Sequence, residues 1–345
     1  MAIQHNLDQL AALLAKPKQR IVITAHANPD GDALGSALGL YHYLKQKGHR
    51  LTIIMPTEMP KFLNWMKDFD QILVYENTRS FSKQIVKDAD IIFSLDYNSL
   101  SRIEQMQSIV ADSKAYKSMI DHHLEPQDFC QEMFSDTTAS STCELVYRFI
   151  DYLEDLEALN TDILNALYVG ILTDTGGLRY ATSPRLFRIV ADMLERGVDN
   201  NKLTDLVFNA YTVKRFNLLG FCISERLEYL EECNTGIIAL SQADHKKYNI
   251  RRGDLEGVVN FILKIRKIRC AVLIAERHDI VKMSMRSKGD FSVQEVCSTY
   301  FNGGGHKNAS GGAVKKPFQE VIEEFRTVIR EHYKEQLTRE IVIEL

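Results

Sequence analysis

The sequence has no pair of cysteines at the C-x-x-C spacing, although it contains six cysteines among 345 residues. Such pairs supply ligands to zinc ribbons or form redox-active disulfides, so their absence argues against both classes. Each cysteine has apolar neighbours, which predicts buried free thiols in a reducing compartment. The six are Cys130, Cys143, Cys222, Cys233, Cys270 and Cys297.

Long apolar runs are also missing. No stretch approaches the ~20 residues that a membrane helix needs. The first 20 residues have a short apolar patch but no basic region, which does not fit a signal peptide. There is no internal repeat, no low-complexity segment and no linker rich in proline, glycine or serine. We therefore expect a cytoplasmic protein without a membrane partner.

The net charge is small, at −4, so there is no overall attraction to nucleic acid or to a membrane surface. Residues 251–316 differ, because they hold 13 Lys and Arg against 6 Asp and Glu, a local net charge of +7. A basic region in an otherwise acidic chain predicts a small anionic ligand and not a long duplex. A solvated face of mixed charge is the alternative.

The length suits two domains better than one core. In the first half, apolar runs at 21–24, 51–55, 90–96 and 117–121 alternate with helical patterns at 7–15, 38–48, 141–153 and 159–176. This alternation predicts an α/β fold with a doubly wound, mostly parallel sheet and helices on both faces. A mainly helical stretch, 184–231, then leads to a second unit.

The second unit is predicted to be a smaller α/β domain with a mixed sheet, separated from the first by a cleft. Strands are expected at 236–241, 268–278, 279–287 and 339–345, with the middle two antiparallel. Helices are expected at 253–265, at 292–301 and from residue 317, and residues 302–312 form a glycine-rich loop. The predicted boundaries are 1–200 for the first domain, 201–232 for a helical connector and 233–345 for the second domain.

Acidic and imidazole side chains follow three of the predicted strands. The carboxyl ends of parallel strands share one edge of a sheet, so these groups are expected to meet there. Gly31 and Gly35 are expected to let the first of these loops turn tightly. The side chains are His26, Asp30 and Asp32 after the first strand, Asp96 after another, and Asp121, His122 and His123 after a third.

Crowded carboxylates repel one another, and cations would resolve this conflict. Mixed carboxylate and imidazole ligands suit Mn²⁺, Fe²⁺ or Zn²⁺ better than Mg²⁺. The number of ligands favours two ions roughly 3.5–4 Å apart, bridged by one carboxylate, which would activate a water for attack on a phosphate ester. For each aspartate alone, a turn or a helix cap is the simpler interpretation.

The segments AHANPDGDALGS (25–36), SLD (94–96), DHH (121–123) and GILTDTG (170–176) occur in this order, followed by NGGGHKNASGG (302–312). In this combination the chain resembles the DHH phosphoesterase superfamily with its DHH-associated C-terminal domain. The stand-alone nanoRNase/pAp phosphatase subfamily is the best match, since the chain lacks the membrane and sensory segments of long cyclic-dinucleotide phosphodiesterases. The resemblance extends from about residue 20 to the end.

The resemblance implies two Mn²⁺ ions, with Mg²⁺, Co²⁺ or Zn²⁺ as substitutes. It implies that Asp96 bridges the ions, that Asp121 orients a metal-bound histidine, His122, and that His123 stabilises charge or donates a proton at the scissile phosphate. Asp96, Asp121 and His123 are thus the expected catalytic residues. The implied ligand sets are His26, Asp30 and Asp96 for one ion, and Asp32, Asp96, His122 and Asp174 for the other.

In the second domain, the resemblance implies substrate binding by the glycine-rich segment. Consecutive glycines let backbone N–H groups approach a phosphate closely. Arg286 suits bidentate binding of a terminal phosphate, and Ser284 lies on the same strand face. A mobile loop and a surface arginine are the alternatives. The segment contributes Gly303, Gly304, Gly305 and His306.

These features predict a metal-dependent phosphohydrolase. The resemblance adds the substrates, which are RNA of two to five nucleotides and 3′-phosphoadenosine 5′-phosphate (pAp), and it favours a homodimer. Cyclic di-AMP or its linear product is an alternative substrate. Polyphosphate is disfavoured, because Tyr300 and Phe301 beside the glycine-rich segment are suited to stack a base. A non-catalytic nucleotide sensor is the alternative from another class, but it would not need an open two-metal centre.

Overall fold

The computed structural model describes residues 7–209, 212–251 and 253–339. The chain divides into two compact units, Met1–Ala210 and Tyr211–Leu345. None of the helices in these described ranges is both long and apolar enough to span a membrane. All six cysteines are free and buried, as predicted.

The first unit contains a six-stranded sheet in which every neighbouring pair of strands is parallel. Its strand order is β3-β2-β1-β4-β5-β6, so the direction of winding reverses between β1 and β4. In sheets of this kind, ligands bind beyond the carboxyl ends of the strands at that reversal. The strands are β1 (Arg20–Ala25), β2 (Arg50–Met55), β3 (Leu73–Val74), β4 (Ile91–Leu95), β5 (Tyr116–Asp121) and β6 (Glu132–Ser135).

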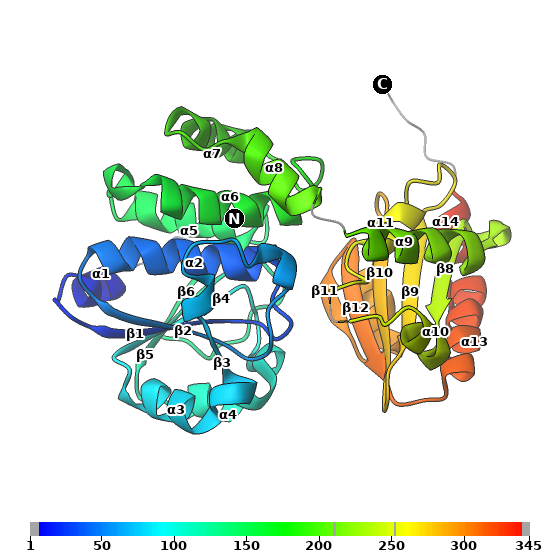
Figure 1. Ribbon diagram of the computed structural model, residues 1–345, viewed down its shortest axis with the longest axis horizontal. Helices are drawn as coiled ribbons and strands as arrows, with labels where there is room; N and C mark the ends of the chain where they lie inside the picture. Colours follow the sequence, from blue (N-terminus) through cyan, green and yellow to red (C-terminus); the bar gives the residue numbers. More distant parts are fainter. Residues whose placement is uncertain (1–6, 210–211, 252, 340–345) are drawn as a thin grey trace. The chain divides into compact units, whose positions relative to one another are not determined.

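Helices cover both faces of this sheet (Figure 1). Alternate residues of β1 serve the two cores: Ile21 and Ile23 pack on the α2 side, and Val22 packs on the α3 side. The doubly wound prediction is therefore confirmed. One face carries α2 (Gly31–Gln46) and α5 (Thr142–Tyr152), and the other carries α3 (Tyr75–Asp88) and α4 (Gln107–Ala111). The remaining helices are α1 (Asp8–Leu14), α6 (Thr161–Asp174), which packs on α2, and then α7 (Pro184–Glu195) and α8 (Asn200–Phe208).

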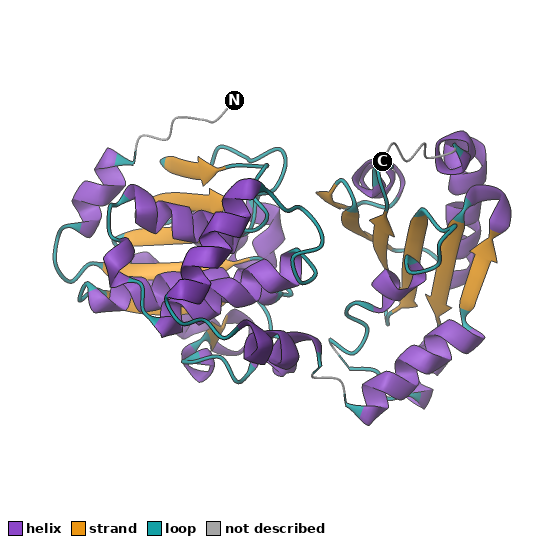
Figure 2. Ribbon diagram, turned by 90° about the horizontal axis from the view of Figure 1, so that it is seen from above, coloured by secondary structure: helices purple, strands orange, loops and turns teal. Residues whose placement is uncertain are grey.

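The second unit has a mixed sheet, as predicted (Figure 2). It contains six strands in the order β11-β12-β10-β9-β8-β7. Only β8 and β9 are parallel neighbours, and β9 and β10 are antiparallel as expected. The strands are β7 (Leu227–Leu230), β8 (Thr235–Leu240), β9 (Cys270–Glu276), β10 (Val281–Ser287), β11 (Gly304–His306) and β12 (Ala309–Val314). One face packs on α12 (Val293–Tyr300), α13 (Phe318–Val328) and α14 (Lys334–Thr338), and the other on α9 (Val213–Glu225) and α11 (Val258–Ile262), while α10 (Gln242–Lys247) follows β8.

Helix α2 begins seven residues earlier than the sequence predicted. The side chain of Asp30 caps it, because Oδ1 accepts hydrogen bonds from the N–H groups of Asp32 at 3.0 Å and Ala33 at 3.1 Å. Gly31 and Gly35 therefore lie on a helix, and the prediction that they form a tight turn is wrong. Their role is close packing: a Cβ on Gly35 would lie 2.5 Å from the carbonyl oxygen of Ala166 in α6.

The second unit differs from the sequence prediction in three places. The end of the predicted helical stretch is strand β7, which is too short to show a clear alternation. The predicted glycine-rich loop is the hairpin of β11 and β12, because pairing of β12 with β10 orders a segment whose glycines have little strand propensity of their own. The predicted helix at 253–265 is reduced to α11, which begins after Gly257 at φ 76°. In the predicted strand at 339–345, residues 340–345 lie outside the described residues.

The segment predicted as a helical connector, 201–232, is divided between the units. Helix α8 belongs to the first unit, whereas α9 and β7 belong to the second.

We expect Gly35→Ala to destabilise the first unit by about 1–3 kcal/mol, the usual cost of overpacking. The added methyl would meet a backbone oxygen, which moves only with its helix. Denaturant unfolding of the full chain measures this change. The control is Gly220→Ala in α9, where nothing lies within 4 Å of the new Cβ and the helix gains stability. An unchanged unfolding transition of the first unit in Gly35→Ala would contradict the assigned packing role.

Candidate active site

The predicted acidic and imidazole side chains lie together at the carboxyl end of the first sheet. His26 follows β1, Asp96 follows β4, and Asp121 is the last residue of β5. The first turn of α2 adds Asp30 and Asp32, and Asp174 ends α6. Because β1 and β4 flank the reversal in strand order, the cluster occupies the position at which such sheets bind ligands.

The first group of ligand atoms comes from His26, Asp30 and Asp96, whose atoms lie within 4.8 Å of one another. His26 Nε2 lies 3.8 Å from Asp30 Oδ1 and 3.3 Å from Asp96 Oδ2. The other ring nitrogen, Nδ1, donates to the Ala27 carbonyl at 2.9 Å. This hydrogen bond fixes the ring and directs Nε2 toward the two carboxylates.

The second group comes from Asp32, His122 and Asp174, again with ligand atoms within 4.8 Å of one another. His122 Nε2 lies 3.3 Å from Asp174 Oδ2 and 3.8 Å from Asp32 Oδ2. Two ligand atoms bound at about 2.1 Å to one cation, at 90–110°, are roughly 3.0–3.4 Å apart. In each group one separation, 3.3 Å, lies in this range and the other, 3.8 Å, is slightly longer, so the residues fit divalent cations.

Asp96 lies between the two groups. Its Oδ2 faces His26, and its Oδ1 lies 3.6 Å from His122 Nε2. The hydroxyl of Thr142 donates to Oδ1 at 3.1 Å. Asp96 has a φ of 62°, in the left-handed region that costs energy for a residue with a Cβ. The backbone thus holds this carboxylate in an unfavourable conformation that directs one oxygen to each group.

Asp32 is completely buried, and the first turn of α5 holds its carboxylate. The N–H of Thr142 donates to Oδ2 at 2.6 Å, and the N–H of Cys143 donates to Oδ1 at 2.9 Å. A helix N-terminus stabilises negative charge there. The sequence analysis did not identify this role of α5, although the cap at Ser141 followed by Glu144 marks the start of a helix.

Asp121 hydrogen-bonds to His123, and the prediction that it orients His122 is corrected. His123 Nδ1 lies 2.7 Å from Asp121 Oδ1, and the N–H of His123 donates to Oδ2 at 3.2 Å. His122 instead directs Nδ1 toward the carbonyl of Ala139, at 3.4 Å. Adjacent side chains at the end of a strand point to opposite sides, whereas side chains two residues apart point to the same side. Asp121 therefore reaches the imidazole of His123 and not that of His122.

The pKa shifts in the cluster reflect its excess of negative charge. Burial raises the pKa of Asp32 well above its usual range, and the neighbouring carboxylates of Asp96 and Asp30 add to this. Burial lowers the pKa of His26, but Asp30 and Asp96 outweigh it and raise the value to about 10. Both shifts favour added positive charge, which divalent cations supply on binding.

The predicted substrate residues of the second unit share one face of its sheet. In β10, Ser284 and Arg286 alternate with buried residues that pack on α12 and α13. Ala309 pairs with both Arg286 and His306, so these two side chains belong to one cross-strand row, and Gly311 links Ser284 to Gly304 in the next. Exposed Lys282 lies on the same face, which is therefore basic.

The glycines of this segment have different roles. A Cβ on Gly303 would lie 2.0 Å from the carbonyl oxygen of Gly311, and Gly305 has a φ of 140° with Ala309 oxygen 2.7 Å from a Cβ position. These two are required by packing inside the hairpin. Gly304 has nothing within 4 Å of its Cβ position, so it alone of the three leaves room for a ligand.

The suggestion that Phe301 stacks on a base is wrong, because its ring is completely buried in the core of the second unit. Tyr300 is half-buried and stacks on His332, with ring centroids 5.6 Å apart. Helix α13 and the segment after it already occupy the surfaces that the sequence left open for a base.

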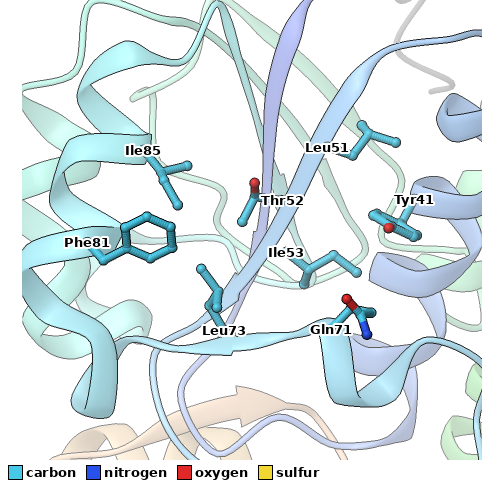
Figure 3. A pocket seen from close by; sticks show the side chains of 8 residues that line it. All are labelled: Tyr41, Leu51, Thr52, Ile53, Gln71, Leu73, Phe81 and Ile85. Carbon is cyan, nitrogen blue, oxygen red and sulfur yellow. The ribbon is translucent and has the colours of Figure 1, made fainter.

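A hollow of about 180 Å³ lies at the other end of the first sheet, beside the uncovered edge of β2 (Figure 3). It is open because the short strand β3 pairs only with Ile54 and Met55. No acidic, basic or imidazole side chain lines it, so it has no groups for the chemistry of the cluster. The lining residues are Tyr41, Leu51, Thr52, Ile53, Gln71, Leu73, Phe81 and Ile85.

Two family models match this chain, the DHH family N-terminal domain at residues 20–171 and the DHHA1 domain at residues 234–335. The chain belongs to the DHH family. The first match contains the strand ends that carry the ligand groups, and the second contains β10 and the β11–β12 hairpin. The resemblance inferred from the sequence motifs is confirmed.

Similar proteins cover nearly the whole of this DHH chain. The bifunctional oligoribonuclease and PAP phosphatase NrnA of Thermus thermophilus is 28% identical over 96% of this chain and 94% of its own length. The cyclic-di-AMP phosphodiesterase GdpP of Bacillus subtilis is 21% identical over 96% of this chain, but over only 50% of its own length. The crystal structure of an exopolyphosphatase-related protein from Bacteroides fragilis superposes with a TM-score of 0.91 at 35% identity, covering 96% of this chain and 97% of that one.

The family and these relatives make the chain a phosphodiesterase or phosphatase of the NrnA-like type. The clustered histidines and aspartates of its first unit suit binding of a divalent metal.

Proposed function

We propose that this DHH enzyme degrades RNA of two to five nucleotides to mononucleotides and removes phosphate from pAp, with two Mn²⁺ ions as cofactors. The observation that carries the proposal is Asp96, whose two carboxylate oxygens face two separate groups of ligands. Such an arrangement suits a pair of cations that share one carboxylate. The Thermus relative, an oligoribonuclease and PAP phosphatase by name, supports short RNA and pAp as substrates.

We assign the residues to two ions in the way that the family pattern implies. His26, Asp30 and Asp96 would hold one ion, and imidazole with carboxylate ligands suits Mn²⁺. When bound, the two ions supply an activated water and neutralise charge on the phosphoryl oxygens. The second ion would be held by Asp32, Asp96, His122 and Asp174.

His123 is the proposed proton donor to the leaving oxygen. Burial lowers its pKa well below the usual range, so the ring needs a partner to hold a proton. Asp121 is that partner, since its Oδ1 lies 2.7 Å from Nδ1. With Nδ1 engaged in this hydrogen bond, Nε2 is the atom that exchanges a proton with the substrate.

The basic face of the second unit is the proposed site for the far end of the substrate. Arg286 would bind a terminal phosphate, Ser284 and His306 would donate to its oxygens, and Gly304 leaves space for it. Short RNA is proposed over a long duplex because the Thermus relative is an oligoribonuclease. A homodimer and a cytoplasmic location stay predictions.

Two alternatives come from the relatives. The name of GdpP suggests cyclic di-AMP as the substrate, and the name of the Bacteroides protein suggests polyphosphate. A non-catalytic sensor is a third alternative, and Asp174→Asn tests it. An enzyme with this substitution should lose turnover and metal. A sensor that binds pAp through Arg286 and His306 should keep its affinity for pAp.

We expect the wild-type chain to bind two Mn²⁺ ions, Asp30→Ala to bind one, and Asp96→Ala to lose high-affinity binding of both. The shared carboxylate contributes to both sites, whereas Asp30 contributes to one. Metal content after dialysis and titration calorimetry measure the stoichiometry. The control Asp112→Ala, at an exposed position of the first unit, should bind two. One ion lost in each of the two site variants would contradict the bridging role.

We expect the enzyme with Mn²⁺ to release mononucleotide from a 5′-phosphorylated diribonucleotide and phosphate from pAp. Cyclic di-AMP and polyphosphate should be cleaved far more slowly under the same conditions. Chromatography of the products with all four substrates in parallel makes the comparison. Cleavage confined to cyclic di-AMP or to polyphosphate would replace the proposed substrate and leave the metal chemistry in place.

We expect His123→Gln to lower kcat on a diribonucleotide by about 10²–10⁴-fold, the usual range for general acid catalysis. The loss should be much smaller on bis(p-nitrophenyl) phosphate, because p-nitrophenolate leaves without a proton. Steady-state kinetics with both substrates, together with the bound Mn²⁺ per chain, measure the effect. Equal losses on the two substrates would mean that His123 acts on the metal site or on substrate binding and not as a proton donor.

A further inference from the structure

The turn that follows Asp174 has an unusual backbone. Gly176 and Gly177 have φ values of 57° and 76°, and two residues with a Cβ, Leu178 at 63° and Ala181 at 49°, are also in the left-handed region. Neither leucine nor alanine adopts this conformation without strain. Strained residues persist where surrounding contacts hold them, and they are concentrated at functional sites.

Thr175, which is completely buried, holds the turn in place. Its carbonyl oxygen accepts hydrogen bonds from the N–H groups of Arg179 at 2.8 Å and Tyr180 at 2.9 Å. Its hydroxyl donates to the carbonyl of Ile171 at 2.6 Å and accepts from the N–H of Leu178 at 2.8 Å. The turn therefore folds back on the end of α6, next to Asp174.

The turn presents a cation and an aromatic ring to solvent. Tyr180 is 59% exposed, and its ring packs over Gly176, where a Cβ would lie 2.9 Å from two ring carbons. The guanidinium of Arg179 lies over this ring, 5.5 Å from its centroid. No carboxylate among the described residues forms an ion pair with Arg179. A guanidinium without a carboxylate partner is available to an anion.

The metal cluster is accessible from solvent at two of its ligands, and one of them, Asp174, directly precedes this turn. Side-chain exposure is 43% for Asp30 and 22% for Asp174, whereas the other ligands are exposed by 8% or less. Arg179 and Tyr180 follow Asp174 by five and six residues, and the hydrogen bonds of Thr175 bring both back to the end of α6. Both residues therefore lie close in the chain to Asp174, a ligand that solvent reaches.

We infer that Arg179 and Tyr180 form a nucleotide-binding surface of the first unit, where Tyr180 stacks on a base and Arg179 binds a phosphate of the same nucleotide. This inference rests on the proposed function and adds to it the residues that select nucleotides over other phosphate esters. Stacking on an aromatic ring accepts any base, which suits an enzyme for short RNA of mixed sequence. The contact between the guanidinium and the ring orients both groups before substrate binds.

The test compares two substrates with Mn²⁺, a 5′-phosphorylated diadenylate and the same molecule with both bases removed. Tyr180→Leu should raise KM for the diadenylate about tenfold or more and leave KM for the abasic substrate unchanged. Tyr180→Phe should behave as wild type, because it keeps the ring. Arg179→Gln should raise KM for both substrates. Tyr152→Leu, at another exposed tyrosine of the first unit, should change neither.

Equal kinetics of Tyr180→Leu and wild type, or an equal loss on both substrates, would overturn the inference. A changed molar mass of Tyr180→Leu in light scattering would also overturn it, because the ring would then belong to a contact between protein chains. Each variant must bind as much Mn²⁺ per chain as wild type. If Tyr180→Leu binds less, Tyr180→Phe is compared with wild type on the two substrates instead. A wild-type enzyme inactive on diadenylate would refute the proposed function itself.

Discussion

The burial of Asp32 is the constraint on which the first unit depends. A carboxylate without any solvent contact needs donors, and here they are two N–H groups at the start of α5. To reach them, α2 must lie close to both α5 and α6. Glycines on α2 and α6 make this close approach possible. A Cβ on Gly170 of α6 would lie 2.7 Å from Asp32 Oδ1. Gly35 of α2 has no space for a Cβ either. Helix packing and ligand geometry are thus set by the same residues.

A second constraint acts through the backbone of Asp96. Its left-handed conformation is unfavourable for aspartate, and the parallel strands β1 and β5 on either side of β4 hold the chain that carries it. The N–H of Asp96 donates to the carbonyl of Ile120 at 3.1 Å, which continues the sheet pairing past the end of β4. The regular sheet therefore maintains a local conformation that the residue would not adopt alone.

Much of the first unit and the location of its site could be predicted from the sequence, because short apolar runs that end in Asp or His mark both the strands and their carboxyl ends. The predictions that failed depend on three-dimensional contacts, which the sequence pattern does not show. Whether Asp30 ends a loop or caps a helix is decided by two hydrogen bonds. Whether Asp121 serves His122 or His123 is decided by strand geometry, and the burial of Phe301 depends on α13, more than 15 residues away in sequence. The hairpin at Gly304 is ordered by pairing of β12 with β10. This pairing could not be predicted from a glycine-rich segment, because glycine has little strand propensity.

The free cysteines and the metal site have a joint consequence for the cohesion of the fold. With all six thiols reduced, no disulfide joins distant parts of this chain. The ligand groups begin at residue 26 and end at residue 174, and they connect α2, α6 and three strands of the sheet. Cations bound there would act as cross-links that close long loops of the first unit, in the way disulfides do in secreted proteins. Folding of that unit and metal uptake would then be linked equilibria.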